Sequence, residues 1–181
     1  MKKQLLLIPF ITLLCFTFSY QQQPIEETEK ELTREEAKSL LDDVLLIWNE
    51  KNLDMIEKHY APDMVLKTSA MPQPLKGYEG LKTWLKSSLT VFPDHHLTFN
   101  EFYIDGNVIF TRFTATGTNT GPLSTPSGEI PATGKSISIS GISFYHIENG
   151  LITEQEVVFN MLDMLMQLGF KVMPPTEEEG Q

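Results

Sequence analysis

The sequence predicts an α+β fold, a cone-shaped α+β barrel in which N-terminal helices pack on a curved antiparallel sheet. Two observations lead to this prediction. Apolar residues recur at helical spacing up to about residue 92, whereas residues 96–159 alternate with a period of two and are broken by turn signals. Helices followed by antiparallel strands are typical of α+β domains, and 181 residues are enough for one domain with a core.

The first twenty residues have the pattern of a signal peptide. Two lysines precede an apolar run, and Thr17-Phe18-Ser19 is a small-x-small cleavage signal. The run is shorter than the ~20 residues that a membrane-spanning helix needs. We therefore expect an exported protein, periplasmic or extracellular, with no membrane attachment in its mature form. A lipid anchor on Cys15, the only cysteine, is the alternative, and Leu14 before it is a poor match to the small residue that lipid attachment needs.

The first helix is the most clearly marked element of the domain, which we place over residues 33–170 after a polar linker at residues 21–32. Thr33 and Glu36 form a capping-box pattern. An apolar stripe at helical spacing then runs as far as Trp48, which predicts that one face of this helix is buried.

Turn signals divide the rest of the domain. Asp105-Gly106 and Asn149-Gly150 favour tight hairpins, so the strands around them are expected to form a meander. Pro93 ends the helix before it. The remaining expected elements are a short helix at 53–60, a strand at 63–68, a helix at 78–92, strands at 96–104, 108–118, 135–147 and 151–159, a helix at 161–169 and an acidic tail at 171–181.

Charge and spacing exclude several kinds of partner. The formal net charge of −10 argues against nucleic acid and against an anionic membrane surface. His95 and His96 are adjacent, so on a strand they point to opposite faces and cannot bind one ion together. His59 and His146 have no acidic or histidine partner at ligand spacing. Since no phosphate-binding loop or dinucleotide fingerprint occurs either, we expect no metal and no cofactor.

One face of the strand at 108–118 is apolar and ends in an amide. Ile109 and Phe113 share this face with Asn119, whereas Arg112 lies on the opposite face. Such a face predicts either the wall of a pocket or a strand that reaches its exposed end.

The last strand has two similarly different faces. Glu154, Glu156 and Asn160 share one face, and Gln155 lies on the other with Val157 and Phe159. Paired carboxylates can perform acid–base chemistry, but a solvent-facing pair is the simpler interpretation. Glu154 can also form a structural ion pair with Arg112 across the sheet.

From about Leu40 to Gly169 the chain resembles the SnoaL-like polyketide cyclase (ester cyclase) family, whose members have the cone fold of nuclear transport factor 2-like proteins. The residues that carry the resemblance are FPD at 92–94, the strand with Arg112, GTNTG at 117–121, PATGK at 131–135, Gly141, NGLITE at 149–154 and QLG at 167–169. The resemblance implies a cofactor-free site inside the cone, in which a carboxylate moves a proton during an intramolecular aldol closure.

Two positions depart from the family pattern. Asn119 replaces the histidine of GTHxG, and Asn160 replaces the acid–base aspartate that ends the last strand. An amide does not titrate, so no catalytic residue is expected. We expect Asn119 and Asn160, with Arg112 and Phe113, to bind a carbonyl or hydroxyl group of a ligand. The alternative is that both amides are structural and bond to the backbone in a closed core.

Three functions follow from these patterns. The first is an exported domain that binds a small apolar, oxygen-bearing molecule in the cone cavity. The second is a cyclase, isomerase or dehydratase with a non-standard base, such as Asp163, Tyr60 or Tyr103. The third is a non-catalytic module that docks or dimerises through the outer sheet face, and a homodimer is expected.

Overall fold

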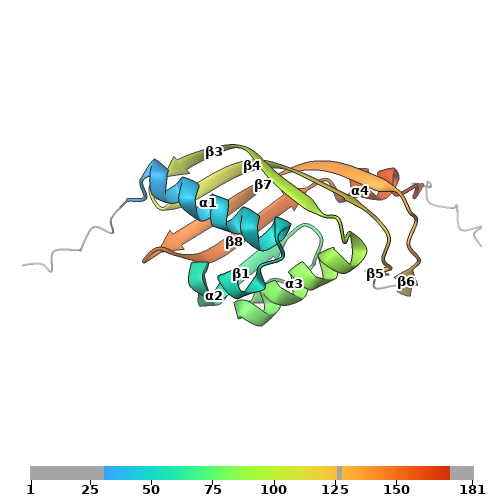
Figure 1. Cartoon of the computed structure of the whole chain (residues 1–181), viewed down its shortest axis with the longest axis horizontal. Coiled ribbons are helices and arrows are strands. Elements are labelled where there is room, and N and C mark those ends of the chain that lie inside the picture. The colour runs from blue at the N-terminus through green and yellow to red at the C-terminus, as the bar shows by residue number, and fades with distance from the viewer. Residues whose placement is uncertain (1–30, 126–127, 172–181) are drawn as a thin grey trace, which may run out of the picture. The chain divides into compact units, whose positions relative to one another are not determined.

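A computed structural model describes residues 31–125 and 128–171 of the chain. The expected signal peptide, nearly all of the polar linker, and the acidic tail from residue 172 onward lie outside the described residues. Figure 1 shows the described elements, which are α1 (Arg34–Asn49), η1 (Leu53–Met55), α2 (Ile56–His59), β1 (Tyr60–Thr68), β2 (Leu75–Lys76), α3 (Gly77–Val91), β3 (His96–Asp105), β4 (Val108–Thr118), β5 (Leu123–Thr125), β6 (Gly128–Ile130), β7 (Ser136–Glu148), β8 (Leu151–Phe159) and α4 (Met161–Gln167).

The main sheet has six strands in the order β2-β1-β8-β7-β4-β3. Strands β3, β4, β7 and β8 form the expected antiparallel meander, and the α+β fold class is confirmed. β1 differs because it pairs with β8 in parallel, which makes the sheet mixed. A parallel pair needs a long connection, and α3 and the first three strands of the meander lie between these two strands in the sequence.

Three short strands, β2, β5 and β6, were not expected from the sequence. β5 and β6 form a two-stranded hairpin within the segment 121–134, which we expected to be a loop. β1 starts at Tyr60 and passes through Pro62, with a register shift against β8 between Tyr60 and Val65. Proline is tolerated there because the shifted segment needs no ladder hydrogen bond from it.

The helices α1 and α3 cover the same face of the sheet. The rings of Trp48 on α1 and Trp84 on α3 meet edge to face with their centroids 4.9 Å apart. The side chain of Asn49 joins α1 to β3, since its Nδ2 donates to the Leu97 carbonyl at 2.9 Å and its Oδ1 accepts from the Leu97 amide at 2.8 Å. The capping box at Thr33, which begins α1, is confirmed. Within residues 31–125 and 128–171, no helix is both long and apolar enough to cross a membrane.

Candidate functional site

A cavity of about 600 Å³ lies between the inner face of the sheet and the helices. Small-molecule sites usually fall between ~300 and ~1,000 Å³, so the space suits a small ligand. The walls are mostly aromatic and aliphatic, and the apolar side chains that form them include Trp48, Trp84, Phe92, Leu97, Phe113, Ala115, Ile137, Ile139, Val157, Phe159, Met161, Met164 and Leu165.

The predicted inner face of β4 is confirmed. Ile109, Phe113 and Ala115 are buried, and the latter two line the cavity. Gly141 on β7 lies opposite Phe113 and gives its ring room, since a Cβ atom there would lie 2.4 Å from Phe113 Cζ. The aromatic wall therefore depends on a glycine in the neighbouring strand.

Three polar residues of β7 and β8 line this apolar space. Gln155 and Tyr145 are register partners, exposed by only 2% and 1%, and Ser143 lies two residues from Tyr145 on the same face. The hydroxyl of Tyr60 donates to Gln155 Oε1 at 3.1 Å, and Gln155 Nε2 donates to the Tyr145 hydroxyl at 3.5 Å. Burial raises the pKa of Tyr145 and that of Tyr60 well above the usual tyrosine value, so both hydroxyls stay protonated at neutral pH.

The strand pattern put Gln155 on the face opposite Asn160, and the expectation that Asn160 binds the ligand chose the wrong face of β8, because the Gln155 face lines the cavity. The available signal was one amide among apolar residues on the inner face of the strand, with Val157 and Phe159 beside it. Its partner Tyr60 lies 95 positions away in the sequence, so their contact was not predictable from local pattern.

His95 is the only histidine that lines the cavity within the described part of the chain. Its ring packs on Trp48, with the centroids 4.8 Å apart and the planes 34° apart. The Nδ1 atom is fully buried and has no hydrogen-bond partner among the described residues. Burial lowers the pKa of His95 to about 4, with His96 adding to the effect and Asp94 opposing it, so the imidazole is neutral at pH 7.

Asn119 lies in a closed network rather than in the cavity lining. It is 1% exposed, and its Nδ2 donates to the Gly121 carbonyl at 2.7 Å and to the Val91 carbonyl at 3.4 Å. Its Oδ1 accepts from the Thr133 amide at 2.8 Å and from the Thr133 hydroxyl at 2.9 Å. All four contacts stay within the protein, so the geometry supports the structural alternative for Asn119.

Asn160 is also outside the cavity lining. It is exposed and forms the N-cap of α4, where its Oδ1 accepts from the Asp163 amide at 3.0 Å. The two amides therefore do not converge on a common space. We expected both to face the ligand, but neither lines the cavity. Of the four predicted binding residues, Phe113 alone lines the cavity.

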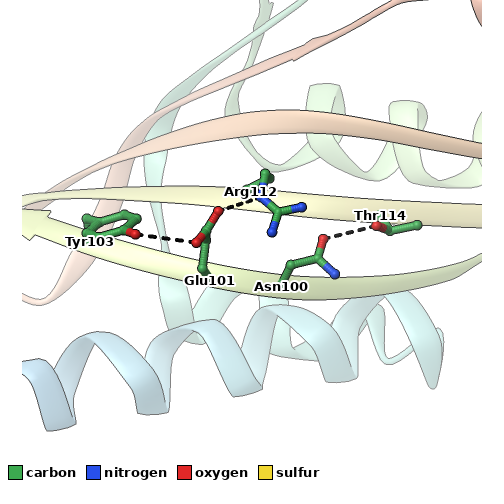
Figure 2. Close-up of polar contacts among 5 residues, drawn as sticks. All are labelled: Asn100, Glu101, Tyr103, Arg112 and Thr114. Atoms are coloured by element: carbon green, nitrogen blue, oxygen red, sulfur yellow. Dashed lines mark hydrogen bonds and ion pairs between the residues drawn. The ribbon is translucent and has the colours of Figure 1, made fainter.

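Arg112 lies on the outer side of the sheet, as its position in the strand predicted. Its Nε donates to Glu101 at 2.5 Å, and Glu101 also accepts from the Tyr103 hydroxyl at 3.3 Å. Figure 2 draws both contacts. Arg112 lowers the pKa of Glu101 through this contact. The expected pairing of Arg112 with Glu154 is wrong, because Glu154 binds Lys67 of the adjacent strand β1.

The non-standard bases named from the sequence do not reach the cavity. Tyr103 is 64% exposed on β3, and Asp163 is an exposed α4 residue that accepts a hydrogen bond from Gln167. Tyr60 lies behind Gln155 and does not line the space. The described residues also contain no group of three or more His, Cys, Asp or Glu side chains placed to hold a metal ion.

Comparison with known proteins gives one consistent result. A model of the SnoaL-like polyketide cyclase family matches residues 38–168, whereas no curated protein matches the chain. The structure is similar to TsrD from Streptomyces laurentii, with 25% identity, a TM-score of 0.67, and coverage of 77% of this chain and 98% of that one. IdmH from Streptomyces antibioticus shares the fold at 22% identity and a TM-score of 0.62, covering 74% and 98%. A protein with a ketosteroid isomerase-like fold from Catenulispora acidiphila also shares it, at 15% identity and a TM-score of 0.61, covering 75% and 97%.

Proposed function

Because the chain belongs to the SnoaL-like polyketide cyclase family, we propose that its cavity binds a small, mostly apolar molecule that carries oxygen. The observation that supports this proposal is a space of about 600 Å³ with aromatic and aliphatic walls and a few polar groups from β7 and β8. Burying apolar ligand surface there contributes roughly 25 cal/mol per Å², and the polar groups fix the ligand's orientation.

Aldol closure by the family's carboxylate is not part of the proposal. The resemblance places the acid–base aspartate at Asn160, and an amide cannot take up the proton. The Asn160 side chain is also engaged at the N-terminus of α4. Asp163 is the carboxylate nearest to Asn160 in the sequence, and it does not line the cavity.

The two tryptophans of the chain, Trp48 and Trp84, both line the cavity, so their emission reports on its occupancy. Titration with 2-nonanone, an apolar ketone, should give a saturable change in emission. Ala115→Phe places a ring inside the cavity and should abolish the change, whereas Thr114→Phe places the same ring on the other face of β4 and should not. Saturable binding that is equal in both variants would refute a site in this cavity.

A second candidate is a cofactor-free acid–base enzyme, and the observation that favours it is His95. The His95 imidazole lines the cavity and is neutral, so a ring nitrogen can accept a proton from a carbon next to a carbonyl group, and its lowered pKa makes it a weak base. Exchange of the α-protons of 2-nonanone in D₂O, followed by NMR, tests this candidate. The wild-type protein should accelerate the exchange and His95→Gln should not. A wild-type rate equal to that in buffer rules it out.

We also propose that the domain acts outside the cytoplasm. The proposal rests on the signal-peptide pattern of the first twenty residues. Expression of the full chain followed by N-terminal sequencing of the exported fraction checks it. Cleavage near Ser19 or Tyr20 is expected, and retention of the intact chain in the cytoplasm would contradict it.

A further inference from the structure

The polar residues of β7 and β8 present hydrogen-bond donors to the cavity. The chain of hydrogen bonds that orients these donors begins at Tyr60. This tyrosine is buried on β1 and does not line the space, and its single proton goes to Gln155 Oε1 at 3.1 Å. Because the carbonyl oxygen of the amide is engaged on that side, the NH₂ group is the end that faces away from Tyr60. Tyr60 thereby sets the orientation of the Gln155 side chain.

The side chains of Gln155 and Tyr145 each have a proton left to donate toward the cavity. One N–H of Gln155 donates to the Tyr145 hydroxyl at 3.5 Å, which leaves its second N–H for another partner. The side chain of Ser143 lies beside the Tyr145 hydroxyl and opposes the effect of burial on the pKa of Tyr145. Because Gln155 donates to the oxygen of Tyr145, the proton of Tyr145 remains for donation.

No negative charge competes for these donors. Among the described residues that line the cavity, Glu129 is the only carboxylate, and it is exposed on the short strand β6. Tyr145 and Gln155 are almost fully buried, so a donor that lacks a partner there costs more than it would in water. A ligand that supplies an acceptor removes this cost, whereas a hydrocarbon does not.

We propose that Tyr145 and Gln155 together bind a carbonyl oxygen of the ligand, and that Tyr60 is the positioning residue that keeps the amide turned toward it. This inference rests on the proposed function and specifies its ligand class. The ligand is an apolar ketone, ester or other acyl compound whose oxygen lies against β7 and β8. Its apolar part then lies against the tryptophan and methionine side chains of the helices.

The probe for the test is 2-nonanone carrying ¹³C at its carbonyl carbon. Hydrogen-bond donation to the oxygen moves the ¹³C resonance downfield, while tryptophan emission reports separately whether the ketone is bound. We expect a downfield shift in the wild-type protein and its loss in Tyr145→Phe, with an affinity about five- to tenfold weaker. Tyr103→Phe removes an exposed hydroxyl on β3 and is the matched control, expected to match the wild type.

The positioning role of Tyr60 needs a separate readout. Tyr60→Phe should reduce the carbonyl shift while the ketone still binds, and it should have no further effect on the shift in a Gln155→Met background. If Tyr60→Phe reduces the carbonyl shift as much in the Gln155→Met protein as in the wild type, Tyr60 acts only on packing and its positioning role is overturned.

Two outcomes overturn the carbonyl site. A bound ketone whose resonance matches its value in an apolar solvent would show that no donor reaches the oxygen. The same conclusion follows if the wild-type protein and Tyr145→Phe shift the resonance equally. An unchanged tryptophan emission at saturating ketone would instead overturn the proposed function, and with it this inference.

Discussion

Replacing Asn119 by alanine is expected to lower the free energy of unfolding by about 2 to 3 kcal/mol without changing ligand affinity. The substitution removes the hydrogen-bond partners of the Gly121 carbonyl and the Thr133 amide, at 2.7 and 2.8 Å. A buried backbone group left without a partner costs about 1–3 kcal/mol, and the Thr133 amide is only partly buried, so the two groups together give roughly 1–4 kcal/mol. The Thr133 hydroxyl is excluded from the sum because it can rotate toward another acceptor.

Urea unfolding followed by circular dichroism measures this cost for the variant and the wild type. Asn100→Ala is the matched control, since Asn100 is an exposed asparagine whose side chain contacts only Thr114 in Figure 2. It should change stability by less than about 0.5 kcal/mol. A loss below about 1 kcal/mol for Asn119→Ala would refute the structural role. Weaker binding of 2-nonanone at unchanged stability would favour the ligand-contact interpretation instead.

Three further predictions follow from the contacts described above. Arg112→Ala breaks an exposed ion pair with Glu101 and should cost less than about 1 kcal/mol in urea unfolding, with 2-nonanone affinity unchanged. Asn160→Asp keeps a helix cap, so the midpoint of thermal unfolding should hardly change, and chromatography should show no closure of a linear polyketone. The pKa of His95 is about 4 in the folded protein and near 6.5 in the unfolded chain, so the unfolded state binds more protons between these values. Stability should therefore fall by up to about 3 kcal/mol as pH drops from 6.5 to 4, and His95→Gln should reduce this dependence in urea unfolding while the exposed His96→Gln should not.

Local signals predicted the fold well wherever neighbouring residues determine the structure. The capping box at Thr33 and the turn at Asn149-Gly150 depend on residues within a few positions of each other. The parallel pairing of β1 with β8 joins segments about ninety residues apart, as in the register of Val65 with Glu154. Such pairing depends on how the helices and the meander pack, which no local pattern records.

The site was predicted less completely for the same reason. Strand alternation placed Phe113 on the inner face, and it lines the cavity, whereas in β8 the residue that lines the cavity is Gln155 and not the expected Asn160 on the opposite face. Strand alternation also placed Asn119 on the same face as Phe113. The hydrogen bonds of the Asn119 side chain, however, go to Val91 and Thr133, which come from other segments. Whether a polar side chain faces a ligand or the backbone is decided by these distant partners.

The groups that line the cavity suggest why an acid is absent from its inner part. A buried carboxylate pays a large desolvation cost unless it is paired and hydrogen-bonded. Amide and hydroxyl donors such as Gln155 and Tyr145 are far less costly to bury, and they hold a neutral carbonyl group without any charge. His95 fits the same logic, because its burial keeps the imidazole neutral. Placing a carboxylate at Gln155 by Gln155→Glu should therefore weaken ketone binding at neutral pH, because the donor that faces the carbonyl oxygen would become an acceptor.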